Sequence, residues 1–198
     1  MDQSDGPRGL GARIAVARGA AETVWNEAMV SAVLEKVDDE TRAVFRPDAI
    51  LAEWIPEKYF VDFINALWAV ARGEKADAKF LRWVDIVTDR GFAEARELFT
   101  SLGGPLFVLR RAQELWSYEH STGTLVHAPL GMQSARLTLR DHPFLETEAT
   151  RDAISEAFRY VVQLTGASGV TESHALTSDG YLHVVLAWTD PAAGDPNV

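Results

Sequence analysis

The spacing of apolar residues changes about half-way along this chain, and this change constrains the fold more than any other feature. Up to about residue 115, apolar residues recur three or four positions apart, as in amphipathic helices. Beyond that point, short segments alternate apolar and polar residues, as in strands with one buried face. A helical block followed by strands joined by tight turns predicts an α+β domain and argues against a doubly wound nucleotide-binding fold.

The first half is predicted to form several separate helices. A long Ala- and Val-rich segment spans residues 12–37, and a turn at Asp38 introduces a short helix near 40–45. The clearest helix is predicted to begin at Pro56, because proline suits the first helical position. Its apolar stripe consists of Phe60, Phe63, Ile64, Leu67, Trp68 and Ala71. Further helices are predicted over 76–88, 92–101 and 106–115, with a break at Gly103-Gly104-Pro105.

The second half is predicted to form an antiparallel sheet with one inserted helix. Extended segments are predicted at 116–120, 124–127 and 135–140, a helix at 150–165, and a hairpin of strands 169–177 and 181–189 around Asp179-Gly180. We expect one domain over 1–198, with a helical part at about 12–115, a sheet part at about 116–189 and a loose tail at 190–198. The helical block should pack on one face of this small sheet.

Composition and charge exclude several classes of protein. The 198 residues include no cysteine, which excludes disulfides, thiol catalysis and cysteine-based metal sites. The net charge is −10 and neither half is basic, so we expect no nucleic-acid partner. The start of the chain lacks a signal-peptide pattern, and the apolar runs are too short for membrane insertion. These features predict a cytoplasmic protein.

Established catalytic and phosphate-binding motifs are absent from the sequence. There is no G-x-x-x-x-G-K-[ST], G-x-G-x-x-G, G-x-S-x-G or H-E-x-x-H, so we predict neither an enzyme nor a bound cofactor. An enzyme with a dispersed site stays open as an alternative. Glu53 and Glu57 flank Trp54-Ile55-Pro56, where a carboxylate favours the positive end of the next helix. We interpret both as structural residues.

All five histidines lie in the second half of the chain. A two-residue turn at Asp179-Gly180 would place His174 and His183 on one sheet face, where they are weak candidates for metal binding or pH sensing. A three-residue loop would place them on opposite faces. His142 follows Asp141 in a turn after a strand, but no nucleophile is evident nearby. The predicted core face of the hairpin carries Ala175, Leu182, Val184, Leu186 and Trp188.

The order and spacing of these features resemble a known group of proteins. Trp54-x-Pro56-x-x-Tyr59-Phe60 precedes the long amphipathic helix, and the strand 135–140 leads into Asp141-His142-Pro143. Over about residues 20–189 this pattern resembles a paralogous myxobacterial family of similar length. That family is similar to the superfamily of haem-NO-binding domains, 4-vinyl-reductase-like domains and TRAPP subunits. The resemblance implies a small sensor or adaptor domain.

The sequence departs from this superfamily at its metal-binding positions. The haem NO sensors hold iron through a histidine and the propionates through Tyr-x-Ser-x-Arg, whereas residues 118–122 read Tyr-Glu-His-Ser-Thr. The cysteine cluster common in vinyl-reductase-like domains is also missing. We therefore carry over no haem ligand. The resemblance further implies a space between the helical block and the sheet. The ligand-pocket candidates for this space are the large apolar residues Phe60, Phe63, Trp68, Trp83 and Trp116. The alternative is that these residues form a filled core.

These observations lead to one main functional hypothesis and one alternative. We expect a non-enzymatic sensor or adaptor that binds a protein partner and is gated by a small apolar ligand. The alternative is a haem-dependent gas sensor. The apolar stripes at 24–33 and 60–71 exceed what one sheet face can cover, which predicts a homodimer through the N-terminal helices.

Overall fold

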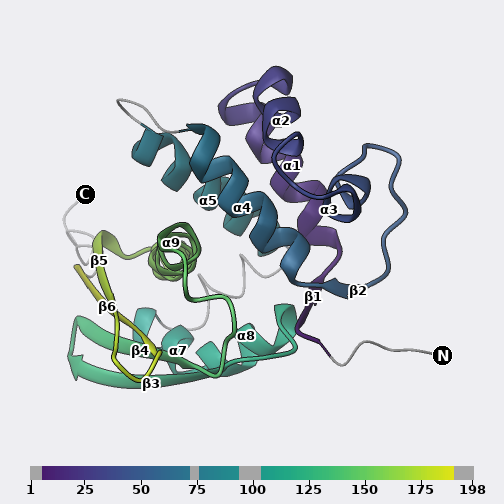
Figure 1. Cartoon of the computed structure of the whole chain (residues 1–198). Helices are drawn as coiled ribbons and strands as arrows, with labels where there is room; N and C mark the ends of the chain where they lie inside the picture. The colour runs from purple at the N-terminus through teal and green to yellow at the C-terminus, as the bar shows by residue number, and fades with distance from the viewer. Residues whose placement is uncertain (1–5, 72–75, 94–103, 190–198) are drawn as a thin grey trace, which may run out of the picture.

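The structure, a computed structural model, describes residues 6–71, 76–93 and 104–189, and it is an α+β fold (Figure 1). The helical block contains five helices and a two-stranded ribbon: β1 (Arg8–Leu10), α1 (Ala12–Val24), α2 (Glu27–Leu34), α3 (Asp39–Val44), β2 (Trp54–Pro56), α4 (Lys58–Ala71) and α5 (Ala76–Gly91). The second part contains α7 (Pro105–Arg110), α8 (Ala112–Glu119), β3 (Thr124–Gly131), β4 (Ser134–Arg140), α9 (Glu148–Leu164), β5 (Ser168–Leu176) and β6 (Leu182–Thr189).

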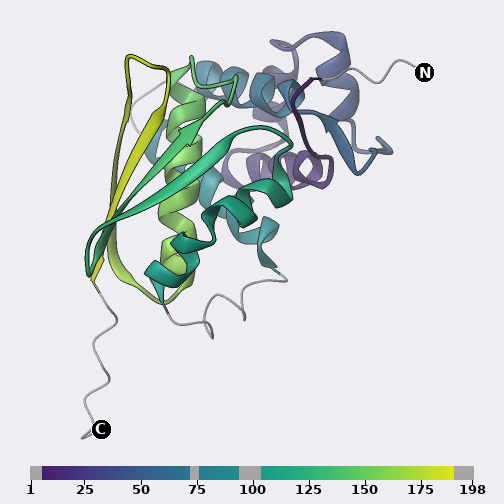
Figure 2. The ribbon, with the colours of Figure 1, turned by 90° about the horizontal axis from the view of Figure 1, so that it is seen from below.

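Helix α9 lies between the helical block and the sheet (Figures 1 and 2). It contacts α4 and α5 on one side and β5 and β6 on the other. The shorter helices α7 and α8 pack against β3 on the same face of the sheet. The N-terminal helices therefore reach the sheet chiefly through α9, which refines the predicted packing of the block directly on the sheet.

The four-stranded sheet is antiparallel throughout, in the order β3-β4-β6-β5. Alternation along the two central strands buries one face, as the pattern of residues 135–140 predicts. Leu137, Leu139, Val184 and Leu186 on that face are fully buried. A separate apolar core fills the helical block, where the rings of Phe45 and Phe63 stack with their centroids 4.2 Å apart.

Two predicted helix boundaries are wrong for local reasons. Residues 12–37 form two helices because the chain turns at Asn26, whose side chain accepts a hydrogen bond from the backbone N–H of Met29 and caps α2. Pro56 ends β2 opposite Arg8, and α4 begins at Lys58. A proline is tolerated in this two-stranded ribbon because a strand with an open edge need not donate every N–H.

The segment predicted as extended at Trp116–His120 is helical up to Glu119, so that prediction is wrong. Trp116 and His120 are four positions apart, so in a helix they lie on the same side. Their rings stack there with centroids 3.8 Å apart. Gly123 follows with φ 96°, and a Cβ there would lie 2.7 Å from the indole nitrogen of Trp116. Glycine is therefore required where the chain turns under this indole.

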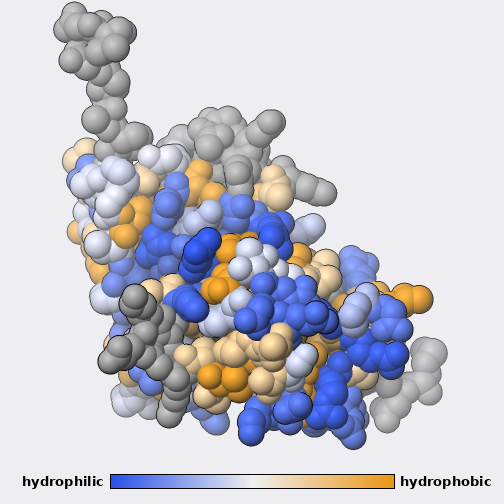
Figure 3. All heavy atoms as spheres, turned by 90° about the horizontal axis from the view of Figure 1, so that it is seen from above, coloured by the Kyte–Doolittle hydropathy of each residue, from blue (hydrophilic) through white to orange (hydrophobic). Residues whose placement is uncertain are grey.

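The apolar stripes that predict a dimer are largely covered within the chain. Val30 and Val33 of α2 pack against α4, where Phe63 and Leu67 are fully buried. Hydrophilic residues occupy much of the surface seen from above, with apolar residues in scattered groups between them (Figure 3). The premise of the dimer prediction is therefore wrong, and the homodimer itself stays a prediction. None of the helices that the structure describes is long and apolar enough to cross a membrane.

Other sequence predictions fall outside the described residues. The helix expected over 92–101 lies mostly there, and so does the tail at 190–198. The predicted break before residue 106 is confirmed in its described part. Gly104 adopts φ 87° at the N-cap of α7, and Pro105 occupies the first turn.

Candidate functional site

A cavity of about 110 Å³ lies between the helical block and the layer formed by α7, α8, α9 and β4. Apolar side chains from all of these elements make up most of its wall, including Phe60 of α4, Trp83 of α5 and Phe158 of α9. An engineered apolar cavity of roughly 150 Å³ is enough to hold benzene. The space between the layers therefore has the scale of a small molecule of about one ring.

The cavity has one polar end, which is built around His120 at the end of α8. The Nδ1 atom of His120 lies 2.5 Å from Oε1 of Glu57, the residue that precedes α4. The Nε2 atom of His120 lies 3.1 Å from Nη1 of Arg13 on α1. Arg13 also places its guanidinium 4.2 Å from the centre of the Phe60 ring. Residues of two different layers are thus joined in one chain of polar contacts.

The contacts of His120 define its protonation state. A guanidinium has only donors, so Arg13 must donate to Nε2, and the proton of the neutral ring must lie on Nδ1. Nδ1 then donates to the Glu57 carboxylate. Burial, followed by the nearby charge of Arg13, holds the pKa of His120 well below its usual value, in agreement with a neutral ring.

Two further polar atoms at this end have no hydrogen-bond partner among the described residues. They are Oε2 of Glu57 and Nδ1 of His142, in side chains that are 3% and 7% exposed. Burial raises the pKa of Glu57, and the charges of His142 and Arg13 oppose that shift. Burial also lowers the pKa of His142 to about 4. Because buried polar atoms normally find partners, these two atoms call for a hydrogen-bonding group that the described residues do not supply, which is a water molecule or a ligand.

Of the five ligand-pocket candidates predicted from the sequence, the structure brings three to the cavity wall. Phe60, Trp83 and Trp116 line it, and the Trp83 indole already donates to the backbone oxygen of Ala17. Phe63 and Trp68 belong to the separate core of the helical block. Whether the three lining residues bind a ligand stays a prediction.

The proposed pairing of His174 and His183 is contradicted by the strand register. Ala175 lies opposite His183, and His174 lies opposite Val184, so the two histidines point to opposite faces of the sheet. The reason is that the strands pair up to Leu176 and Leu182, which leaves an odd-numbered loop instead of a two-residue turn. The same register places Ala175 on the exposed outer face, away from its predicted core position.

His174 instead faces helix α9. Its Nε2 lies 3.1 Å from Oδ1 of Asp152 and its Nδ1 lies 3.3 Å from Oε2 of Glu172. Among the described residues, no group of three or more histidine, aspartate or glutamate side chains is placed to hold a metal ion.

Sequence reasoning missed the residues that make up the polar end of the cavity. The sequence predicts a structural charge at a helix end for Glu57, but Glu57 is buried against His120, while Glu53 is exposed. The sequence suggests Asp141 as the neighbour of His142, but Asp141 is exposed, and His142 lies against the rings of Trp116, His120 and Phe144. The sequence signal at Glu57 is a carboxylate that directly follows the apolar residues Trp54-Ile55-Pro56.

Comparison with known proteins identifies the fold. No family model and no curated protein matches the sequence. The structure is similar to the Fe(II) unliganded H-NOX protein from K. algicida, with a TM-score of 0.69, 9% identity, and coverage of 92% of this chain and 98% of the other. The α+β fold is thus that of H-NOX domains, and the predicted resemblance to haem-NO-binding domains is confirmed for the fold. The resemblance to a myxobacterial family stays a prediction.

Two further similar structures support the same assignment of fold. An oxygen-binding H-NOX domain related to soluble guanylate cyclases has a TM-score of 0.59 and 11% identity, with 91% and 95% of the two chains covered. A protein studied for haem distortion in the H-NOX family has a TM-score of 0.61 and 10% identity, with the same coverage. At this level of identity the likeness concerns the fold alone.

The residues around the cavity of this chain do not fit a haem. His120 has both ring nitrogens engaged, and the unpartnered Nδ1 of His142 shares the polar end of the cavity with the Glu57 carboxyl. Arg13, which would have to meet a propionate, is held by His120, Phe60 and Glu119. The cavity of about 110 Å³ is also well below the roughly 300–1,000 Å³ of pockets for drug-sized ligands.

Proposed function

We propose that this chain is a non-enzymatic sensor domain that binds a small, mostly apolar molecule between its layers and passes that event to a protein partner. The observation that carries the proposal is the position of the cavity. Its wall combines residues of the helical block with residues of the sheet layer, and its polar end joins Arg13 and Glu57 of the first to His120 of the second.

A ligand in this position contacts both layers at once. Any molecule that fits one relative placement of the layers better than another shifts the equilibrium between those placements. The layers are held together chiefly through α9 and the contacts around the cavity, so a small change in the cavity moves one layer against the other. The resulting displacement of surface residues is what a protein partner would recognise.

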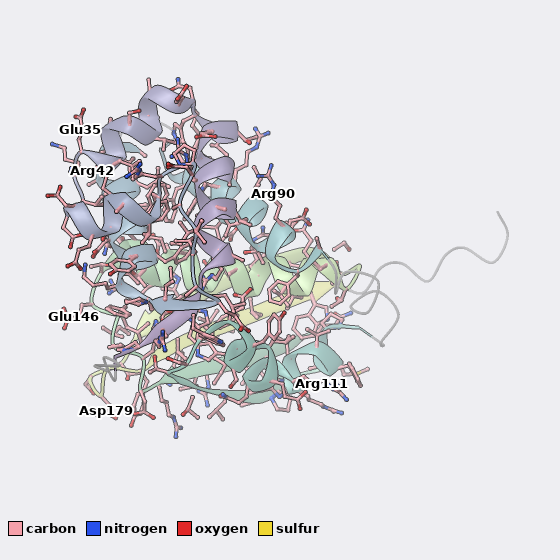
Figure 4. All side chains as sticks on the ribbon, turned by 90° about the vertical axis from the view of Figure 1, so that its right-hand side faces the viewer. Glu35, Arg42, Arg90, Arg111, Glu146 and Asp179 are labelled. Carbon is pink, nitrogen blue, oxygen red and sulfur yellow. The ribbon has the colours of Figure 1, made fainter. Side chains whose placement is uncertain are left out.

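The proposal can be tested by measuring the distance between the two layers. The chain has no cysteine, so paired cysteines can carry spin labels without background labelling. Glu35 at the end of α2 and Asp179 in the β5–β6 loop are both exposed and lie on opposite layers (Figure 4). We expect the distance distribution between labels at Glu35→Cys and Asp179→Cys to shift when toluene or phenol is added at saturation.

A matched pair of labels within one layer provides the control. Arg111, which lies between α7 and α8, is exposed on the same layer as Asp179 (Figure 4). The distance between labels at Arg111→Cys and Asp179→Cys should stay unchanged under the same conditions. The proposal is wrong if neither probe changes the melting temperature of the chain or the distance between layers.

The comparisons favour a second candidate function, a haem-dependent gas sensor. This candidate rests on the shared fold, since one similar structure is an oxygen complex and another was studied for haem distortion. It requires the layers to separate enough to admit a macrocycle, and His142 is the residue on the cavity wall with an unpartnered ring nitrogen.

Absorbance after incubation with haemin separates the two candidates. The first candidate predicts no stoichiometric Soret band after removal of free haemin. The second predicts such a band, and a shift of that band in His142→Phe but not in His183→Phe, which changes a histidine on the outer face of the sheet.

A further inference from the structure

The polar end of the cavity defines the chemical class of the ligand beyond its apolar character. We infer that the site selects a neutral molecule with a single hydroxyl group on an apolar body of about one aromatic ring, and that the hydroxyl lies between Glu57 Oε2 and His142 Nδ1. This inference rests on the proposed function, because it names the ligand of the same cavity.

Glu57 Oε2 and His142 Nδ1 are both buried and have no hydrogen-bond partner among the described residues. Both belong to side chains that are more than nine-tenths buried and that line the same cavity. The other oxygen of Glu57 is taken by His120, which itself is held by Arg13 and by stacking on Trp116. The position of Glu57 is therefore fixed, and Oε2 is the buried atom left for a further hydrogen-bond partner.

The hydrogen-bonding capacity of these two atoms matches that of a hydroxyl group. The Glu57 carboxylate accepts a hydrogen bond through Oε2, and a neutral histidine donates or accepts at Nδ1 according to its tautomer. A hydroxyl group donates one hydrogen bond and accepts others, so it satisfies both atoms at once. A methyl or methoxy group in the same place would leave Oε2 buried without a donor, which is costly.

The charges on the cavity wall disfavour charged ligands. A carboxylate or phosphate would meet the Glu57 carboxylate, and the one cation on the described part of the wall, Arg13, is already shared by His120, Glu119 and the Phe60 ring. An ammonium group could pair with the Glu57 carboxylate, but it would lose its hydration in a small and mostly apolar cavity, which costs more than burying a hydroxyl group. A neutral group is therefore favoured.

The volume limits the size of the apolar body. A cavity of about 110 Å³ is somewhat smaller than the engineered cavity of roughly 150 Å³ that holds benzene. Phenol is therefore near the upper limit, and it brings its ring against Phe60, Trp116 and Phe158, where aromatic edges and faces are available.

The experiment is a ligand series on the full chain, read by calorimetry and by the fluorescence of the cavity tryptophans. The probes are phenol, anisole, toluene and benzoate, which share the ring and differ in the polar group. We expect phenol to bind at least about tenfold more tightly than anisole or toluene, and benzoate to bind most weakly. In Glu57→Gln the amide presents a donor, so the ratio of phenol to anisole affinity should fall towards one.

Glu53→Gln is the matched control, because Glu53 is exposed on the same segment. It should leave the ratio of phenol to anisole affinity unchanged. If toluene or anisole binds the wild-type chain as tightly as phenol, the hydroxyl inference is wrong while the proposed function stands. If benzoate binds most tightly, the inference is wrong because the site prefers an anion. If none of the four probes binds, both proposals are wrong.

Discussion

The core of the helical block and the cavity beside it are built from the same kinds of residue, yet only one of them is filled. Within the block, Phe63 stacks on Phe45 and lies beside Trp83, and Trp68 meets the edge of Phe80. Three residues earlier on α4, Phe60 faces the cavity and also lies beside Trp83. One turn of helix thus separates a packed aromatic core from a wall with open space in front of it.

The difference lies in the polar groups that cross between the layers. Arg13, Glu57 and His120 connect the layers at the cavity end, and Arg159 of α9 pairs with Asp85 of α5 further along. Charged and hydrogen-bonded side chains need specific distances and cannot collapse as aliphatic side chains do. Packing of Phe45 against Phe63 inside the block follows the shape of the rings, whereas packing between the layers also follows these polar contacts.

The largest expected effect compares two phenylalanines on α4. Phe63→Ala should lower the free energy of unfolding by about 3–5 kcal/mol, because it removes a fully buried ring from a filled core. Phe60→Ala should cost about half as much, because its ring is only partly buried and already borders open space. Urea unfolding of both variants measures the difference. Equal losses would mean that the cavity is closed in solution.

The second prediction concerns the pH dependence of stability at the polar end. The pKa of His142 is about 4 in the folded chain, against an ordinary value of 6.5, because burial disfavours the charged ring. The unfolded state therefore binds a proton first as the pH falls, and stability is lost between about pH 6.5 and pH 4. This loss should amount to about 3 kcal/mol.

His142→Phe keeps an aromatic ring next to Trp116 and removes the titrating group. We expect its free energy of unfolding to lack that part of the decline when unfolding is followed from pH 7 to pH 4. His183→Phe serves as the control. An unchanged slope in His142→Phe would show that His142 is not buried in its neutral form.

The third prediction has the opposite sign and concerns the contact between α5 and α9. Burial, with a second contribution from the adjacent Glu156, raises the pKa of Asp85 to about 7, against the pull of Arg159. The folded chain therefore holds a proton that the unfolded chain releases, and this contribution to stability is lost as the pH rises from about 4 to about 7.

Asp85→Asn cannot ionise, so it should be more stable than the wild type above pH 7, by about 1–2 kcal/mol after allowance for partial exposure. Asp89→Asn, one turn further along α5, is the matched control. Thermal melts at pH 5 and pH 8 measure both variants. Destabilisation of Asp85→Asn at pH 8 would show that pairing with Arg159 outweighs burial.

The smallest expected effects come from the two histidines of the hairpin. His183 lies on the outer face, and His183→Ala should change stability by less than about 0.5 kcal/mol. His174 contacts Asp152 of α9, so His174→Ala should cost more, up to about 1 kcal/mol. Equal effects from the two substitutions would remove the distinction between the layer-facing and outer faces of the sheet.

The sequence by itself determined the succession of elements, because helices and strands with one buried face follow local periodicity. The stripe of Phe60, Phe63, Ile64 and Leu67 and the alternation over 135–140 predicted α4 and β4 within two residues. Of the five aromatic residues that the family resemblance placed between the layers, Phe60, Trp83 and Trp116 line the cavity there. Local patterns carry this information because a helix or strand must bury one face wherever it packs.

Only the tertiary structure decided which polar groups meet. Arg13, Glu57, His120 and His142 are distant in sequence, and each alone resembles an ordinary surface or capping residue. The number of residues in the hairpin loop likewise decided which sheet face each histidine occupies. An odd number places His174 on the face opposite His183. Periodicity reports which face of an element is buried. It does not report how elements are positioned against one another, and that positioning brings two unpartnered polar atoms to the end of an apolar cavity.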